Sequence, residues 1–334
     1  GFLGPAMRKT LSVTDSALET SVAGVNFPTP IGLAAGFDKN GRAIRTMAGI
    51  GFGFVEIGSV SLSWSPGNSR PRLFRLPDDR SVIVAYGVPN EGAEAVSSRL
   101  SRTEFSVPVG INIVKTNGGP GSPPGSDEAI VAEYVEATRA LQRHADYLMF
   151  NLSCPNTADG KDFFSDASRL DMWLSAMAAE KTVRPIFLKV SPLGGVPAVE
   201  RLLASLEPYD FVDGIMFNLP IVKPEGEIVT PRAVWSDLPG AVSGPPSAAM
   251  LDSCLAACYR MMDKNRYRLF ASGGVSTGAN AYQKIRLGAS LVSLHTALIY
   301  EGPLVVRRVT RQLSQLLARD GIAHIADVVG ADNS

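Results

Sequence analysis

The sequence has little cysteine, little histidine and no excess of charge of either sign. Of 334 residues, three are Cys and three are His, while Lys+Arg and Asp+Glu both number 32 and give a formal net charge of +0. Sparse cysteine argues against a disulfide scaffold and suits a reducing compartment. The balanced charge offers no basic excess to neutralise phosphates, so we expect no nucleic-acid partner.

Long apolar runs are also missing. No stretch of 18 apolar residues occurs, so we expect no membrane-spanning helix. The chain begins with Gly rather than Met, so a membrane-associating segment upstream would not be visible. We therefore expect a cytoplasmic protein, peripheral to a membrane only if such a segment precedes this chain. Hydrophobic residues make up 45% of the sequence, which is enough for a sizeable core and excludes global disorder.

Short, continuous apolar runs recur along the chain. Continuous rather than alternating hydrophobicity is typical of strands buried on both faces, as in parallel sheets. We expect eight such strands, at residues 31–36, 52–60, 107–113, 145–153, 185–191, 214–220, 268–275 and 291–297. Helical spacing of apolar residues between strands predicts helices at residues 129–143, 247–262, 279–287 and 303–317.

Eight strands alternating with helices predict an α/β fold, a (β/α)8 TIM barrel, with a doubly wound open sheet as the alternative. Residues 70–90 predict a β-hairpin inserted between strands 2 and 3, with its turn at Pro77-Asp78-Asp79. Residues 20–27 predict a shorter hairpin that plugs the barrel floor. We expect an N-terminal segment and hairpin at 1–30 and the barrel at 31–334.

Polar residues gather where the expected strands end, and in a barrel these ends form one rim. Amides both donate and accept hydrogen bonds, and a lysine within a strand is costly unless it faces an anion or an electron-rich atom. Gly273-Gly274 allows close backbone approach and offers N–H groups to a phosphate. These features suggest a flat, phosphate-bearing cofactor across the barrel mouth. The amides and lysines are Asn112, Asn151, Asn218, Lys39 and Lys189.

Several long motifs around these residues resemble those of the dihydroorotate dehydrogenase family, and they occur in the order and at the spacing typical of that family. They include PIGLAAGFDKNG, GFGFVEIGSV, PGNSRPRLFRLP, FNLSCPNT, FLKVSP and ASGGVSTGANAYQKIRLGASLVSL, between residues 22 and 330. The resemblance implies a TIM barrel that binds flavin mononucleotide (FMN) and oxidises dihydroorotate to orotate in pyrimidine biosynthesis. It also implies a small-molecule substrate, an electron acceptor that is a quinone or a soluble molecule, and a chain able to form a homodimer.

The resemblance also implies roles for individual residues. Cys154 matches the catalytic base, which takes a proton from the carbon next to a carbonyl while the neighbouring carbon gives a hydride to the flavin. Lys189 would stabilise negative charge on the reduced flavin. Matches to cofactor positions are Ala34, Ala35, Gly36, Ser59, Asn112, Asn151 and Lys189, with Gly244, Gly273, Gly274, His295 and Thr296 on the phosphate side. Matches to substrate contacts are Lys39, Asn151, Asn156 and Asn218.

Some positions depart from the family pattern. The opening motif and hairpin resemble the quinone-using class, but that class carries Ser where Cys154 stands, and the soluble class carries Cys. Val84 replaces a substrate-reading Asn, and Phe217 and Leu219 flank Asn218 where Thr is usual. These three changes suggest an alternative function, in which a related flavoenzyme of specialised metabolism acts on a different carbonyl-conjugated C–C bond.

Other interpretations of single residues stay open. Cys154 could be a buried structural thiol, Lys189 a Schiff-base lysine of an aldolase, and Lys39 a surface partner of Asp38. His295, which stands where the family usually has Tyr, could be a packing residue. A flavin-binding barrel without turnover is the non-enzymatic alternative. Cys254 and Cys258 lie four residues apart, but without His ligands nearby we expect no metal.

Overall fold

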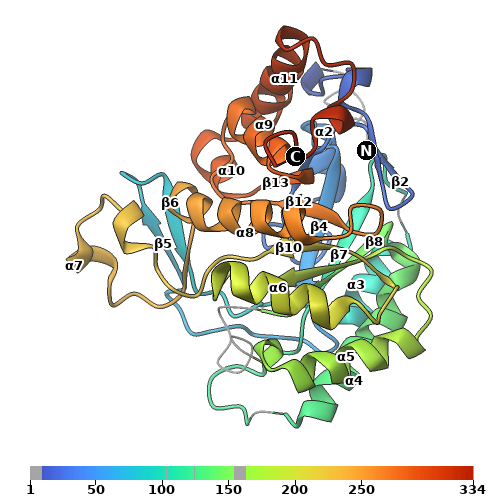
Figure 1. Cartoon of the computed structure of the whole chain (residues 1–334). Coiled ribbons are helices and arrows are strands. Elements are labelled where there is room, and N and C mark those ends of the chain that lie inside the picture. Colours follow the sequence, from blue (N-terminus) through green and yellow to red (C-terminus); the bar gives the residue numbers. More distant parts are fainter. Residues whose placement is uncertain (1–9, 103, 124, 154–162, 334) are drawn as a thin grey trace.

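A closed barrel of eight parallel strands forms the centre of the computed structural model, which describes residues 10–102, 104–123, 125–153 and 163–333 (Figure 1). The order around the barrel is β10, β12, β13, β3, β4, β7, β8 and β9, and β10 pairs with β9 to close it. The barrel and its expected strands are confirmed. Their bounds are β3 (Ile31–Leu33), β4 (Phe54–Val60), β7 (Val109–Ile113), β8 (Tyr147–Asn151), β9 (Ile186–Val190), β10 (Val212–Phe217), β12 (Arg268–Ala271) and β13 (Ala289–Leu294).

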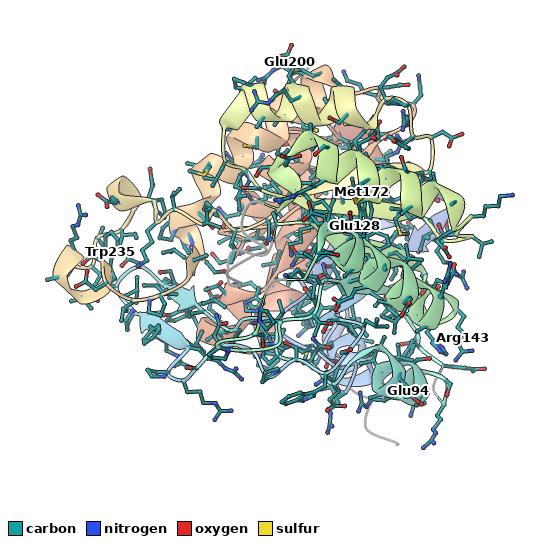
Figure 2. All side chains as sticks on the ribbon, turned by 90° about the horizontal axis from the view of Figure 1, so that it is seen from below. Glu94, Glu128, Arg143, Met172, Glu200 and Trp235 are labelled. Carbon is teal, nitrogen blue, oxygen red and sulfur yellow. The ribbon has the colours of Figure 1, made fainter. Side chains whose placement is uncertain are left out.

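Helices cover the outside of the barrel. Seen from below in Figure 2, Glu200 on α6, Met172 on α5, Glu128 on α4 and Glu94 on α3 follow one another around it. The α-helices are α2 (Ile44–Gly49), α3 (Ala93–Leu100), α4 (Asp127–Leu141), α5 (Ala167–Ala179), α6 (Gly195–Leu206), α7 (Arg232–Trp235), α8 (Ala248–Met261), α9 (Gly278–Arg286), α10 (Thr296–Glu301) and α11 (Leu304–Arg319). The four expected helices are thus confirmed as α4, α8, α9 and α11. In the described part of the chain, no helix is both long enough and apolar enough to cross a membrane.

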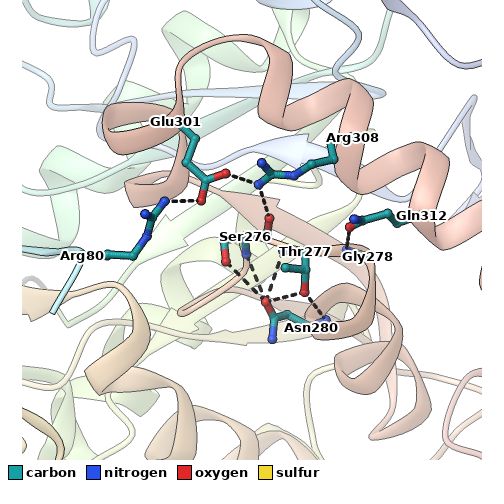
Figure 3. Close-up of polar contacts among 8 residues, drawn as sticks. All are labelled: Arg80, Ser276, Thr277, Gly278, Asn280, Glu301, Arg308 and Gln312. Atoms are coloured by element: carbon teal, nitrogen blue, oxygen red, sulfur yellow. Dashed lines mark hydrogen bonds and ion pairs between the residues drawn. The ribbon is translucent and has the colours of Figure 1, made fainter. Parts of the chain in front are cut away.

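Short 3₁₀ helices lie between the longer elements, and a capping box marks the start of α9. The 3₁₀ helices are η1 (Ser16–Leu18), η2 (Gln142–His144), η3 (Phe163–Ser165), η4 (Glu225–Glu227), η5 (Pro245–Ser247) and η6 (Ile325–Val328). At the start of α9, the Thr277 side chain accepts from the Asn280 backbone N–H at 3.1 Å, and the Asn280 side chain accepts from the Thr277 backbone N–H at 3.1 Å (Figure 3). This capping box satisfies N–H groups that have no partner within the helix, so it fixes where α9 begins.

The barrel interior is filled by aromatic and apolar side chains. Phe54, Tyr147, Phe187 and Phe270 are at most 1% exposed, and the Phe187 and Phe270 ring centroids lie 4.7 Å apart. Glycine at inward positions of neighbouring strands makes room for these rings. A Cβ built on Gly32, for example, would lie 2.2 Å from the Phe54 ring. The interior is therefore a packed core below the rim.

A hairpin closes the floor of the barrel, as the sequence predicts. It consists of β1 (Thr20–Val22) and β2 (Val25–Phe27), which pair antiparallel. Val22 and Phe27 are both 2% exposed and belong to the interior cluster, and the Phe27 ring packs edge-on against Phe54 with centroids 5.5 Å apart. The domain boundary at residue 30 stays a prediction.

The predicted insertion is a three-stranded sheet that projects beside the barrel mouth, together with α7 (Figure 1). The expected hairpin is present as β5 (Leu73–Leu76) and β6 (Ser81–Val84). A third strand, β11 (Ala241–Ser243), pairs with β6 and was not expected from the sequence. Trp235 packs with the sheet in a small apolar cluster of its own. The sheet thereby acquires a core separate from the barrel.

We expect Gly32→Ala to destabilise the protein by about 1–3 kcal/mol, because the new methyl group would overlap the Phe54 ring inside a packed barrel. Gly226→Ala is the matched control, because a Cβ there meets no atom within 4 Å, and its effect should stay within about 0.5 kcal/mol. Urea unfolding followed by circular dichroism measures both. Equal stabilities of the two variants would contradict the packed interior.

Candidate active site

A cavity of about 1250 Å³, including the space at its open mouth, lies at the carboxyl ends of the barrel strands. Its wall is formed by strand ends, by the inserted sheet and by the loops before α8 and α9. Thirteen of the residues predicted from the sequence line it: Ala34, Ala35, Gly36, Lys39, Ser59, Asn151, Lys189, Asn218, Gly244, Gly273, Gly274, His295 and Thr296. Residues at the strand ends, spread over more than 260 positions of the sequence, thus come together around one cavity.

Amide and hydroxyl groups are joined by hydrogen bonds on the barrel side of the cavity. The Asn218 amide donates to Asn151 Oδ1 at 3.1 Å and to the Ser153 carbonyl at 2.8 Å. The Asn151 amide donates to Ser59 Oγ at 3.3 Å. Lys189 stands on the adjacent strand β9 and is 8% exposed. This part of the wall can exchange hydrogen bonds with a flat polar ring and face it with a positive charge.

Asn112 lies beneath this wall rather than in it. It is fully buried, is not among the cavity-lining residues, and touches the cavity wall through Ser59, whose hydroxyl donates to Asn112 Oδ1. Its amide donates in the other direction to Glu56 Oε1 at 3.0 Å. The structure thus places Asn112 as a support for Ser59.

Glycines on the opposite side of the cavity form a cradle of backbone groups. Gly244, Gly273 and Gly274 have φ of +112°, +87° and +69°, in the region that favours glycine. A Cβ on Gly273 would lie 2.5 Å from a Leu251 methyl group, so the space also requires glycine. The hydroxyls of Ser243 and Thr296, 2.7 Å apart, stand beside them. Backbone N–H groups and hydroxyls at one end of a cavity suit a phosphate.

Lys39 lies in the cavity wall, which disfavours its interpretation as a surface residue. Its Nζ donates to the Gly36 carbonyl and lies 4.3 Å from the centre of the Tyr86 ring. The Asp38 carboxylate is buried and accepts from the backbone N–H groups of Arg42 and Ala43, at 2.9 and 2.7 Å. Asp38 thereby holds the turn that directs Lys39 inward.

His295 lines the cavity at the end of β13, with its ring edge-on to Phe37 at 5.9 Å between centroids. Desolvation, together with the positive charges of Lys39 and Lys189, lowers the pKa of His295 to about 4. The imidazole is therefore neutral near pH 7, and it is both packed and cavity-lining.

The three departures from the family pattern occupy different places. Val84 and Leu219 line the cavity. The expectation that Phe217 alters the same pocket is wrong, because Phe217 is 4% exposed and packs in the outer core between barrel and helices. Side chains alternate along a strand, so Phe217, the last residue of β10, points outward between Met216, which packs inside the barrel, and Asn218, which faces the cavity. Only two of the three changes therefore reach the cavity.

Sequence reasoning missed the residues that join the inserted sheet to the barrel at the cavity mouth. Arg80 at the hairpin turn and Glu301 at the end of α10 both line the cavity and form an ion pair at 2.5 Å. Glu301 also binds Arg308 of α11, which donates to the Ser276 carbonyl at 2.9 Å (Figure 3). The Tyr300 hydroxyl donates to the Ser81 carbonyl at 2.6 Å. The paired residues lie far apart in the sequence, so no local sequence pattern predicts these contacts.

Two predicted residues, Cys154 and Asn156, lie outside the described residues, and their roles stay predictions. The other two cysteines are buried in α8, where burial raises both pKa values, that of Cys258 to about 12. Such thiols are poor nucleophiles. Among the residues that the structure describes, no group of three or more His, Cys, Asp and Glu side chains could hold a metal ion.

The lowered pKa of His295 predicts a pH effect on stability. An unfolded His takes up a proton near pH 6.5, whereas the folded protein resists this proton down to about pH 4. The folded state therefore loses stability as the pH falls from about 6.5 to 4, by at most about 3 kcal/mol. Relative to wild type, His295→Gln should show a shallower loss over this range in urea unfolding of the ligand-free protein. Identical pH profiles would contradict this assignment.

Comparison with known proteins places these features in one family. The sequence profile of the family described as dihydroorotate dehydrogenase matches residues 17–317. The chain is 36% identical over 335 residues to the dihydroorotate dehydrogenase (quinone) of Sphingopyxis alaskensis, covering 98% of this chain and 90% of that protein. It is 38% identical over 340 residues to the protein of that name from Thermobifida fusca, covering 98% and 86%.

Solved structures agree with the sequence comparison. The DHODH of Eimeria tenella in complex with ferulenol has a TM-score of 0.85 and 30% identity, with 96% of this chain and 90% of that chain covered. The ligand-free structure of the Eimeria tenella protein has the same TM-score and identity and is covered over 93% of its length. The fold, the cavity and the near-complete coverage show that this chain belongs to the dihydroorotate dehydrogenase family.

Proposed function

We propose that the chain oxidises dihydroorotate to orotate with FMN bound across the barrel mouth, and that it passes the electrons to a quinone. The observation that carries the proposal is the family match over residues 17–317, joined to a cavity that thirteen of the expected site residues line. Membership makes the chain a flavin-dependent oxidoreductase acting on the CH–CH bond of dihydroorotate. This favours dihydroorotate over the alternative substrate, and an enzyme over an aldolase or an inactive barrel.

Two ends of the cavity support assigning the flavin more narrowly, as FMN. A Cβ on Gly273 or Gly274 would lie 2.5 or 2.8 Å from a neighbouring side chain, so the cradle requires glycine there, and Ser243 and Thr296 add hydroxyls beside it. A phosphate held there would leave the ring to face Ser59 and Lys189 across the cavity. A single phosphate and a polar ring edge are the features of FMN, so we assign the glycine cradle to the phosphate and the Lys189 side to the ring.

The substrate would lie against Lys39, Asn151 and Asn218, whose side chains offer a charge and amide groups to a carboxylate and a cyclic imide. Cys154 is the proposed base, and it takes the proton from the carbon next to a carbonyl. When bound, the flavin accepts the hydride that leaves the neighbouring carbon, so that the C–C single bond becomes a double bond. Lys189 stabilises the negative charge that this transfer brings to the ring.

The acceptor is proposed from the relatives, whose names specify quinone. A quinone would accept the two electrons taken from dihydroorotate. We expect a short-chain quinone to reoxidise the dihydroorotate-reduced protein in stopped-flow experiments, and fumarate and NAD⁺ to do so much more slowly. Faster reoxidation by either soluble molecule would overturn the quinone assignment.

The base is tested by anaerobic reduction of the bound flavin with dihydroorotate. Cys154→Ala should retain FMN but slow reduction by about 10²–10⁴-fold, because proton abstraction loses its acceptor. Cys154→Ser should retain measurable reduction, mostly at higher pH. The control is Cys254→Ala, which removes a buried thiol that contacts the Pro192 carbonyl, and it should reduce at the wild-type rate. A Cys154→Ala protein that reduces like wild type would show that the base is another group.

A further inference from the structure

We infer that Glu56 is a positioning residue for the bound cofactor: its carboxylate sets the direction of a hydrogen-bonded chain of amides beneath the cavity and compensates the charge of Lys189. The inference rests on the proposed function, since it concerns how the FMN site is built. Glu56 does not line the cavity and would not touch the ligand. Its effect would pass through the residues that do.

Glu56 is a charged residue inside the barrel. It stands on β4 two positions after Phe54, so both side chains point inward, and it is 0% exposed. Its Oε1 accepts from the Asn112 amide at 3.0 Å, and its Oε2 accepts from the Tyr147 hydroxyl at 3.3 Å. The backbone of Ala35 supplies a further hydrogen bond. Each of these partners donates to the carboxylate, as an ionised group requires.

A continuous chain of side-chain hydrogen bonds leads from Glu56 to the cavity. Asn112 donates to Glu56, and its Oδ1 accepts from the Ser59 hydroxyl. Ser59 Oγ accepts from the Asn151 amide at 3.3 Å, and Asn151 Oδ1 accepts from the Asn218 amide at 3.1 Å. Ser59, Asn151 and Asn218 all line the cavity. The chain therefore joins a buried carboxylate to the groups that face the cofactor and the substrate.

The carboxylate decides which way this chain runs. An ionised carboxylate can only accept, so it turns the NH₂ group of Asn112 toward itself and the amide oxygen toward Ser59. Ser59 then donates its hydrogen to Asn112 and accepts from Asn151, which leaves one oxygen lone pair for a ligand in the cavity. A neutral amide at position 56 could donate instead, which would let Asn112 turn over and Ser59 rotate. Loss of the charge would thus change the hydrogen-bonding pattern that a ligand meets.

Charge compensation is the second contribution. Burial raises the pKa of Glu56 above its ordinary value, and the positive charge of Lys189 and the hydrogen bonds from Asn112 and Tyr147 reduce that rise without cancelling it. Lys189 is itself 8% exposed and lines the cavity. Each buried charge therefore reduces the cost of the other. Without Glu56, the lysine charge would act on the flavin ring uncompensated and would favour the reduced, more negative flavin.

Two variants separate the two contributions. Glu56→Gln keeps the shape of the side chain, removes its charge and permits the hydrogen-bonded chain to reverse. We expect a more positive midpoint potential of the bound flavin. We also expect an FMN Kd raised about tenfold, which corresponds to the loss of one charged hydrogen bond. Glu56→Asp keeps the charge but is one methylene too short for the Asn112 contact. It should raise the Kd without the positive shift in potential, and it also serves if Glu56→Gln fails to fold.

The matched control is Asp252→Asn, which also converts a carboxylate paired with a buried lysine into an amide, but in the helix layer, where Asp252 pairs with Lys284. It should lower thermal stability and leave the flavin Kd and potential at wild-type values. Fluorescence titration of the flavin-free proteins gives Kd, and anaerobic dye equilibration gives the potential. Wild-type Kd and potential in both Glu56 variants, whatever their stability, would overturn the inference. A wild-type protein that does not bind FMN would instead overturn the proposed function.

Discussion

The alternation of side chains along the barrel strands is the constraint on which the rest of this structure depends. Every second residue points into the barrel, and from floor to rim these inward positions change from apolar to polar. Phe54 is followed two residues later by Glu56, Phe187 by Lys189, and Met149 by Asn151. The lower layer excludes water and holds the strands in place. The upper layer supplies charges and amides. Their electrostatic interactions are strong there, because the layer below them is apolar and has a low dielectric constant.

The polar layer is stable because its members satisfy one another. Glu56, Asn112, Ser59, Asn151 and Asn218 share a hydrogen-bonded chain. A half-satisfied network at this depth would cost more than an apolar core. The same arrangement leaves the outward groups of the layer in fixed orientations. The same contacts therefore stabilise the folded barrel and orient the groups that line the cavity.

Much of this architecture follows from the sequence, because its signals are local. Continuous apolar runs predict the barrel strands, and the polar residues that end them predict the cavity wall. Adjacency in sequence to Asn218 predicts a pocket position for Phe217 wrongly, because strand alternation turns its side chain to the outer core. Strand β11 and the contacts of Arg80 with Glu301 join segments far apart in the chain, so no local pattern predicts them. Glu56 had a visible signal, a single carboxylate within the apolar run FGFVEIGSV, that was not used.

An experimental structure of the protein with FMN and orotate would test the central claim most directly. We expect the phosphate to bind the backbone N–H groups of Gly273 and Gly274, and the flavin ring to contact Lys189 and Ser59. Orotate should then lie between the ring and the side chains of Lys39, Asn151 and Asn218. A phosphate bound away from the glycine cradle, or a ring with no contact to Lys189, would contradict the layered account of this site.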